Sequence, residues 1–215
     1  MRQADKYVYP GTNVLVNKFG CRDPEKLKEI EILSSGGNLA WLQLHPVEGQ
    51  FDFKHLRDIH YAIFQDLYDW AGQIRDVDIG KNNLFCRAQY INEYAKTVFT
   101  DFFSSCNAVK DRRSAFVETL ATHYADMNAL HPFREGNGRA QREFTRELCL
   151  KCGYVFDLTR TTHQEMLSAS IASFNRGDNT ELTAIFEKSV IPVDEYKDFQ
   201  DRLTSVLLIL SSDDI

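Results

Sequence analysis

One short segment, residues 131–142 (HPFREGNGRAQR), holds most of the side chains that could do chemistry. Pro132 disfavours the α conformation at His131, so the preceding helix is expected to end there, with the imidazole free to face a cleft. Imidazole has an unperturbed pKa of about 6.5 and is a common general base. We therefore predict that His131 accepts a proton during catalysis.

The glycines and arginines of this segment predict a site for a polyphosphate. Gly136 and Gly138 permit backbone conformations in which successive N–H groups converge on an anion at the positive end of the next helix. Arg139 and Arg142 are three residues apart and so lie near one another on that helix. Backbone amides together with two guanidinium groups offer more positive charge than one phosphate needs.

Glu135 stands among these cationic groups, where a bare carboxylate would weaken the binding of an anion. A cation between the carboxylate and the phosphates removes this conflict. Mg²⁺ is usually held at nucleotide sites by one or two carboxylates together with phosphate oxygens. We predict that Glu135 binds Mg²⁺ and that Phe133 turns inward to anchor the loop.

Each of these features also has an ordinary structural explanation when it is taken alone. A histidine at a helix end is usually structural, and a pair of glycines usually makes a turn. Arg139 and Arg142 alone would more often be surface salt-bridge partners. Their combination at this spacing is what favours a functional site.

The overall composition is that of a soluble globular protein. The chain has 215 residues, of which 43% are hydrophobic and 26% charged, enough for one domain with a core. The net charge of −6 argues against a general affinity for nucleic acid. The longest apolar run, VLLIL at residues 206–210, is too short to cross a membrane.

The cysteines and the N-terminus favour the cytoplasm. Five cysteines lack the spacing of a disulfide framework, and the first ten residues lack the apolar core of a secretory signal. Export by a route that needs no such signal stays open. Cys149 and Cys152 lie inside a helical pattern, which favours buried thiols over a metal or redox site.

The elements around the segment are expected to be helical, within one domain. Asp23 and Pro24 mark the start of one helix, which SSGGN at residues 34–38 should end. Apolar residues at helical spacing predict a helix that stops at Gly72 and another over residues 89–103. Further helices are expected through Phe116, Leu120, Tyr124 and Met127, then at about 138–152, 162–175, 180–190 and 194–209.

Residues 74–86, IRDVDIGKNNLFC, break the helical pattern. Val77 and Ile79 alternate with Asp76 and Asp78, GKNN turns the chain, and LFC returns. Alternation on either side of a turn predicts a short β-hairpin. The fold class expected is therefore all-α with one small β-hairpin.

The segment HPFREGNGRAQR resembles the signature of Fic (filamentation induced by cAMP) domains, H-x-F-x-[D/E]-G-N-G-R-x-x-R, at every specified position. Residues 63–79 resemble the family's helix that leads into a hairpin flap, and residues 7–20 resemble the arm of bacterial Fic toxins. The likeness covers most of residues 7–190. It implies a Fic domain with an N-terminal arm over residues 1–192 and a helical tail at 193–215.

The resemblance implies transfer of AMP from ATP to a hydroxyl group of a target protein. His131 would deprotonate this hydroxyl, which attacks the α-phosphorus as pyrophosphate leaves. Glu135 would bind Mg²⁺. Arg139 would face the β-phosphate and Arg142 the γ-phosphate. The phosphates would also be held by Gly136, Asn137 and Gly138. The intact GNGR form favours adenylylation over the phosphorylation or phosphocholine transfer of members with another residue at the first motif glycine.

By the same resemblance, the hairpin is a flap that binds the target. An exposed edge strand offers unpaired N–H and C=O groups, to which a target segment can add as a further strand. Phe85 would clamp the incoming residue, unless it folds onto the core instead. The flap residues are Ile79, Gly80, Lys81, Asn82, Asn83, Leu84 and Phe85.

Many Fic proteins carry an inhibitory helix, [S/T]-x-x-x-E-[G/N], whose glutamate pairs with the second motif arginine, here Arg142. Ser114, Thr161 and Thr183 begin partial matches, but each lacks the final glycine or asparagine. The sequence therefore predicts the toxin half of a two-protein module. A small helical antitoxin would supply the glutamate in trans and dock near the N-terminal helices.

The resemblance suggests subunits of bacterial type II topoisomerases as targets. Three alternatives stay open: a secreted effector that modifies host GTPases, an enzyme that transfers another nucleotide or removes AMP, and a non-catalytic module that docks a partner through its flap. The last has no need for His131, Glu135 and Arg142 together. The negative charge and the lack of a basic recognition helix disfavour a DNA-binding regulator.

Overall fold

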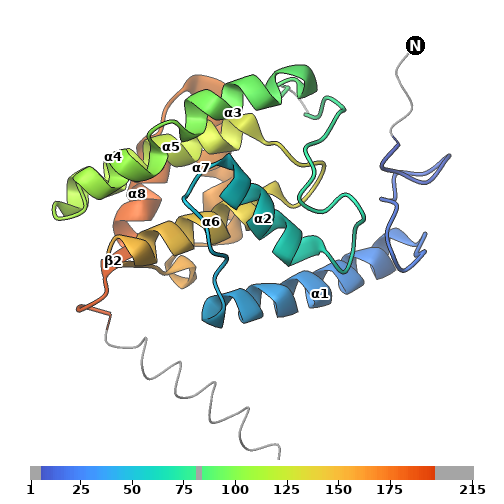
Figure 1. The fold of residues 1–215 in the computed structure, drawn as a ribbon, viewed down its shortest axis with the longest axis horizontal. Coiled ribbons are helices and arrows are strands. Elements are labelled where there is room, and N and C mark those ends of the chain that lie inside the picture. Colours follow the sequence, from blue (N-terminus) through green and yellow to red (C-terminus); the bar gives the residue numbers. More distant parts are fainter. Residues whose placement is uncertain (1–5, 81–83, 197–215) are drawn as a thin grey trace, which may run out of the picture.

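Helices make up most of the structure, a computed structural model that describes residues 6–80 and 84–196 (Figure 1). The elements follow in the order α1 (Pro24–Leu44), α2 (Phe53–Phe64), η1 (Ala88–Tyr90), α3 (Ile91–Phe99), α4 (Phe102–Ala108), α5 (Arg113–Leu130), α6 (Asn137–Lys151), β1 (Tyr154–Phe156), η2 (Leu158–Arg160), α7 (His163–Arg176), α8 (Thr180–Ser189) and β2 (Val190–Pro192). The predicted, mainly helical fold class is confirmed. No helix within the described ranges is long and apolar enough to cross a membrane.

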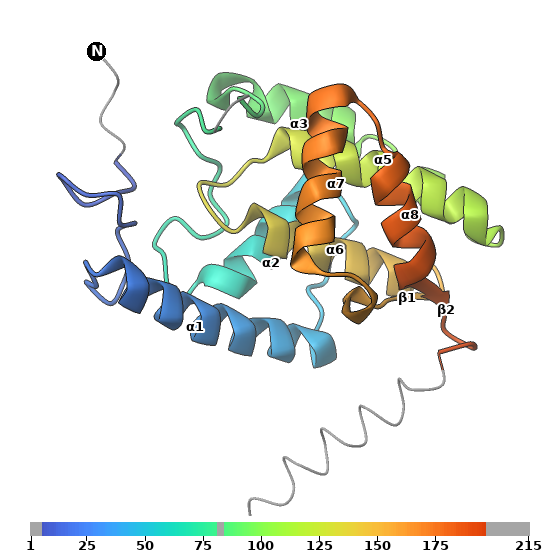
Figure 2. The ribbon, with the colours of Figure 1, turned by 180° about the vertical axis from the view of Figure 1, so that it is seen from behind.

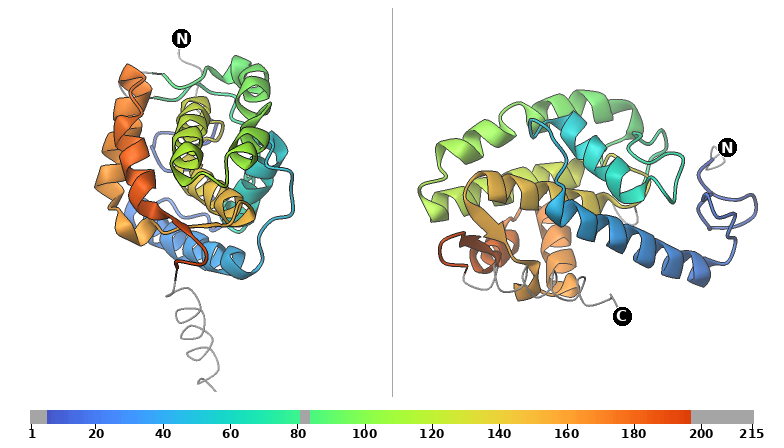
Figure 3. Two further views of the ribbon diagram at one scale, coloured as in Figure 1. Left: turned by 90° about the vertical axis from the view of Figure 1, so that its left-hand side faces the viewer. Right: turned by 60° about the horizontal axis from the view of Figure 1, so that its bottom comes forward.

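The helices α5 and α6 form the centre of the fold and are joined by the loop that contains the motif. α2 packs on α6, and α1 packs on α2 at the edge of the molecule (Figure 3). α3 and α4 lie along α5, while α7 and α8 pack on another side of it (Figure 2). The motif loop is therefore supported by packed helices rather than displayed on an extended tip.

The apolar face predicted for the central helix is its buried face. Phe116, Leu120, Tyr124 and Met127 of α5 are at most 2% exposed. Burying a large apolar side chain contributes about 1.5–3 kcal/mol, so these four side chains hold α5 firmly in place. The C-terminal end of α5, where the motif begins, is thereby fixed relative to its neighbours.

The helix predicted to stop at SSGGN does not stop there. α1 runs through both glycines to Leu44. The Ser35 hydroxyl donates to the carbonyl of Glu31 at 2.6 Å, and the Asn38 side-chain amide donates to the carbonyl of Ile63 in α2 at 3.1 Å. Contacts with α2 thus offset the roughly 1 kcal/mol that each glycine costs inside a helix. Helix propensity alone therefore predicted the wrong C-terminal end for α1.

The second predicted helix ends earlier than expected. α2 stops at Phe64 rather than at Gly72, and the N–H groups of Leu67 and Tyr68 both donate to the Phe64 carbonyl in the turns that follow. Leu67 and Trp70 are nevertheless buried. The spacing of apolar residues therefore predicted burial correctly and the helix end wrongly.

The predicted hairpin is present as a narrow antiparallel turn without an assigned strand in the described residues. Gly80 and Leu84 form an isolated antiparallel bridge, and the N–H of Phe85 donates to the carbonyl of Ile79 at 3.2 Å. The turn itself, residues 81–83, lies outside the described residues. We call residues 77–86 the flap.

A two-stranded sheet lies elsewhere, where the sequence did not predict one. β1 and β2 pair antiparallel beyond the end of α6, with Tyr154 opposite Pro192 and Phe156 opposite Val190. Strands of three residues are too short to show alternation. The single helix predicted over residues 89–103 is divided between α3 and α4, and most of the helix predicted over 194–209 lies outside the described residues.

Candidate active site

His131 occupies the first position after α5 with a left-handed backbone, at φ 44° and ψ 61°. This conformation costs a residue with a side chain about 1–2 kcal/mol, so the surroundings must hold it. Nδ1 of the imidazole lies 3.1 Å from the carbonyl oxygen of Asn128, which can only accept a hydrogen bond. Nδ1 therefore carries the ring proton, and Nε2 keeps its lone pair for accepting another.

The imidazole is partly buried and packs against the flap. The ring of Phe85 stacks on it with centroids 3.7 Å apart and planes 9° from parallel. Burial lowers the pKa of His131 from 6.5 to about 4, against the opposing effect of the hydrogen bond to Asn128, and the nearby Arg75 guanidinium lowers it further. His131 is therefore neutral at pH 7, as a general base must be.

Asn137 closes the motif loop into a ring. Its side-chain oxygen accepts from the N–H of Phe133 at 2.9 Å, and its side-chain nitrogen donates to the carbonyl of the same residue at 2.8 Å. Phe133 is fully buried, as predicted. Because the Asn137 side chain is committed to the loop, a phosphate would meet the backbone N–H of this residue instead.

The backbone N–H groups that were predicted to bind an anion lie at the start of α6. Asn137 and Gly138 are the first two residues of the helix, so their N–H groups have no carbonyl partner within it. Gly136 before them has φ 82°, and a Cβ there would lie 2.3 Å from the ring of Phe64. Only glycine fits at this position, where its left-handed backbone lets the chain enter α6.

His60 supports the loop from beneath and was not predicted. Its Nδ1 accepts from the N–H of Gly72 at 2.9 Å, so Nε2 is protonated and donates to the carbonyl of Glu135, also at 2.9 Å. The ring stacks on Phe133 with centroids 3.8 Å apart. Burial lowers the pKa of His60 to about 3. A neutral histidine thus holds the loop backbone in place, and no motif in the sequence marks it.

Glu135 offers one half-exposed carboxylate at this site. Its Oε1 accepts from the N–H of Gly136 at 2.9 Å and lies 3.9 Å from a guanidinium nitrogen of Arg139. No group of three metal-ligating side chains occurs among the described residues. A single carboxylate fits Mg²⁺, which completes its shell with waters and substrate phosphates, better than it fits a metal with only protein ligands.

The two motif arginines differ in their contacts with the rest of the protein. Arg139 donates to the hydroxyl of Ser35 at 3.0 Å and pairs with the carboxylate of Glu31 at 2.5 Å, so α1 reaches the motif. The Tyr68 hydroxyl donates to the same carboxylate. Arg142 lies near the buried Tyr124, whose pKa is raised by burial and lowered in part by the charge of that arginine. The sequence gave no sign of the Glu31 contact.

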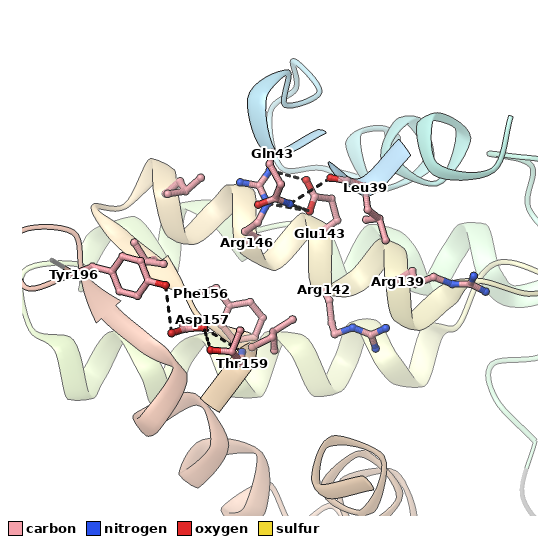
Figure 4. A pocket seen from close by; sticks show the side chains of 13 residues that line it. Leu39, Gln43, Arg139, Arg142, Glu143, Arg146, Phe156, Asp157, Thr159 and Tyr196 are labelled. Carbon is pink, nitrogen blue, oxygen red and sulfur yellow. Dashed lines mark hydrogen bonds and ion pairs between the residues drawn. The ribbon is translucent and has the colours of Figure 1, made fainter. Parts of the chain in front are cut away.

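The site residues are distributed between two cavities. The larger, about 1350 Å³, is lined by His131, Glu135 and Asn137, by α7, and by the flap residues Ile79, Gly80, Leu84 and Phe85. The smaller, about 520 Å³, lies between α1, α6 and β1 and is lined by both Arg139 and Arg142 (Figure 4). His131, Glu135 and the flap thus line the larger cavity together, while Arg139 and Arg142 line the smaller one.

Comparison with known proteins identifies the family of the chain. Residues 50–149 match the Fic/DOC family. The Escherichia coli (strain K12) protein named "Probable protein adenylyltransferase Fic" is 35% identical over 188 residues, which cover 86% of this chain and 92% of the relative. The chain belongs to the Fic/DOC family.

Further relatives of this Fic chain agree in sequence and in fold. Protein adenylyltransferase VbhT of Bartonella schoenbuchensis is 34% identical over 86% of this chain and 39% of its own length. Among solved structures, the VirB-translocated effector protein BepC of Bartonella tribocorum, with bound AMPPNP, has a TM-score of 0.80. It is 27% identical, and the match covers 86% of this chain and 96% of that one.

The depressed pKa of His131 gives a direct test of its burial. Because burial disfavours the imidazolium form, the ring should remain neutral as the pH falls through about 6.5 and become protonated only near pH 4. Imidazole ¹⁵N shifts in an NMR pH titration would follow this, with the spectrum of His131→Ala identifying the signal. A midpoint at or above about 6.5 would mean that the ring is solvated.

Proposed function

We propose that the chain transfers AMP from ATP to a hydroxyl side chain of a target protein. The observation that carries this proposal is the neutral His131, whose Nε2 keeps its lone pair and which lines the same cavity as Asn137, the first residue of α6. Two relatives at 34–35% identity are named protein adenylyltransferases. The similar BepC structure holds AMPPNP, an ATP analogue.

In the proposed reaction, the target hydroxyl attacks the α-phosphorus of ATP. Nε2 of His131 takes the proton of the target hydroxyl, and the oxygen forms a bond to the α-phosphorus as the bond to the β-phosphate oxygen breaks. AMP remains as an ester on the target, and pyrophosphate leaves. Charge that develops on the phosphates meets the N–H groups of Asn137 and Gly138 and the guanidinium groups of Arg139 and Arg142.

Mg²⁺ bound by Glu135 would neutralise part of the charge on the phosphates. The carboxylate is half exposed and lines the larger cavity, where it accepts from the N–H of Gly136 and lies 3.9 Å from a guanidinium nitrogen of Arg139. That arrangement leaves carboxylate lone pairs for a cation. Mg²⁺ and ATP are thus the proposed metal and substrate.

The flap is the proposed docking place of the target. Its residues Ile79 and Leu84 line the larger cavity with His131, so a segment added to the flap edge would pass the imidazole. Phe85 covers that imidazole and also contacts Phe174 of α7, with ring centroids 4.8 Å apart. Its proposed role as a clamp therefore requires the ring to shift when the target hydroxyl approaches Nε2.

A small helical antitoxin is the proposed regulator. The chain lacks the complete inhibitory pattern, so the glutamate would come in trans. Arg142 opens onto the smaller cavity beside α1, and α1 exposes Leu33, Trp41 and Leu44 on its surface. An amphipathic helix could cover these apolar side chains and bring a carboxylate to Arg142.

Labelled ATP tests the proposed transfer. Incubation with Mg²⁺ and bacterial lysate should label proteins, with subunits of type II topoisomerases as the first bands to identify by mass spectrometry. His131→Ala should lower the rate at least about 10²-fold, the usual contribution of a general base. The matched control is His163→Ala, which removes an exposed histidine at the start of α7 and should leave the rate unchanged. Transfer that survives His131→Ala would refute the assignment.

Co-expression tests the proposed regulator separately. Expression of the chain in bacteria should arrest growth, and a small open reading frame adjacent to its gene should relieve the arrest. Substituting the glutamate of that partner's [S/T]-x-x-x-E-[G/N] segment by glycine should abolish the relief, so that growth is arrested again. Toxicity that no adjacent partner changes would favour the alternative of a secreted effector.

A further inference from the structure

The residue that joins the flap to the motif is an arginine outside the motif. Arg75 is 1% exposed and is among the largest fully buried side chains of the described chain. It lies in the segment between α2 and the flap, which passes beside the connection of α5 to α6 (Figure 1). A buried cation needs hydrogen-bond partners that replace water, and these partners show what Arg75 holds.

Among the described residues, the side chain of Arg75 donates to three backbone carbonyls, one in the motif loop and one at each end of the flap. Nε donates to the carbonyl of His131 at 2.9 Å. Nη1 donates to that of Val77 at 2.7 Å, where the chain enters the flap, and Nη2 to that of Cys86 at 2.5 Å, where the chain leaves it. The rigid guanidinium fork thus fixes both ends of the flap to one another and to His131.

Further contacts make this junction continuous. The N–H of Arg75 donates to the carbonyl of Pro132 at 2.9 Å, and the N–H of Cys86 donates to that of Ala129 at 3.1 Å. The ring of Phe85, one residue before Cys86, stacks on the imidazole of His131. The Arg75 side chain is the one group in this set that bonds to both ends of the flap and to His131, and its bond to the His131 carbonyl helps to hold the left-handed backbone there.

We propose that Arg75 is a positioning residue that couples the target-binding flap to the general base. It touches neither nucleotide nor target in this account, and it acts through the three carbonyls. The inference rests on the proposed adenylylation for its effect on rate. Its structural part, the coupling of flap and His131, stands without that activity.

Arg75→Lys is the informative variant, because lysine keeps the stem but replaces the planar fork by a compact ammonium group that cannot span three carbonyls. Arg113→Lys is the matched control. Arg113 also donates to backbone carbonyls, those of Val190 and Glu187, but it begins α5 and lies at the opposite end of that helix from His131. A fall in transfer that came only from lost stability would follow the melting temperature in both variants.

Three measurements on the full chain decide the proposal. Hydrogen exchange should show faster exchange of the Phe85 and Cys86 amides in Arg75→Lys, by about tenfold or more, and no change there in Arg113→Lys. The affinity for AMPPNP with Mg²⁺ should stay within about threefold of that of the unsubstituted protein. Transfer of label from ATP should fall at least about tenfold, the effect of losing one charge-assisted hydrogen bond.

Two results would overturn the coupling. One is unchanged exchange of Phe85 and Cys86 in Arg75→Lys. The other is a loss of transfer that follows the melting temperature equally in both variants, which would make Arg75 a core residue only. If the unsubstituted protein transfers no label, the proposed adenylylation fails, while the exchange measurements still judge the coupling. Arg75→Gln, which removes the buried charge, provides the same tests if the lysine variant does not fold.

Discussion

The structure depends on holding a polar, partly left-handed loop rigid between two helices of an apolar core. His131 and Gly136 both have positive φ, which the chain must sustain without the regular hydrogen bonds of a helix. Asn137 supplies the missing bonds from within the loop, and His60 supplies one from α2. With these in place, His131 and the first residue of α6, Asn137, line the same cavity.

Burial gives the polar groups of this loop their chemical properties. His60 and His131 are kept neutral because the surrounding rings exclude water, and each is oriented by a backbone group that fixes its tautomer. His60 becomes a donor to the loop, and His131 becomes an acceptor with Nε2 free. Two histidines with depressed pKa values thus take opposite roles because their hydrogen-bond partners differ. Arg75 adds a positive charge whose bonds link the flap to the same loop.

The motif and the fold class followed from local patterns, whereas the supports of the site did not. Residues 131–142 carry their chemistry in sequence order, and Pro132 and Gly136 act on adjacent residues, so the loop could be predicted. His60 meets Glu135 across 75 positions, and Arg139 meets Glu31 across 108. Such contacts arise only when α1 and α2 are packed. The same packing carries α1 through the glycines that seemed to end it.

The central claim is that the loop between α5 and α6 grips the phosphates of ATP beside His131. A crystal structure with AMPPNP and Mg²⁺ tests it most directly. The account predicts phosphate oxygens within about 3 Å of the N–H groups of Asn137 and Gly138, and the α-phosphate facing the cavity that His131 and the flap line. A nucleotide bound with its phosphates away from these amides, in a cavity that does not contain His131, would contradict it.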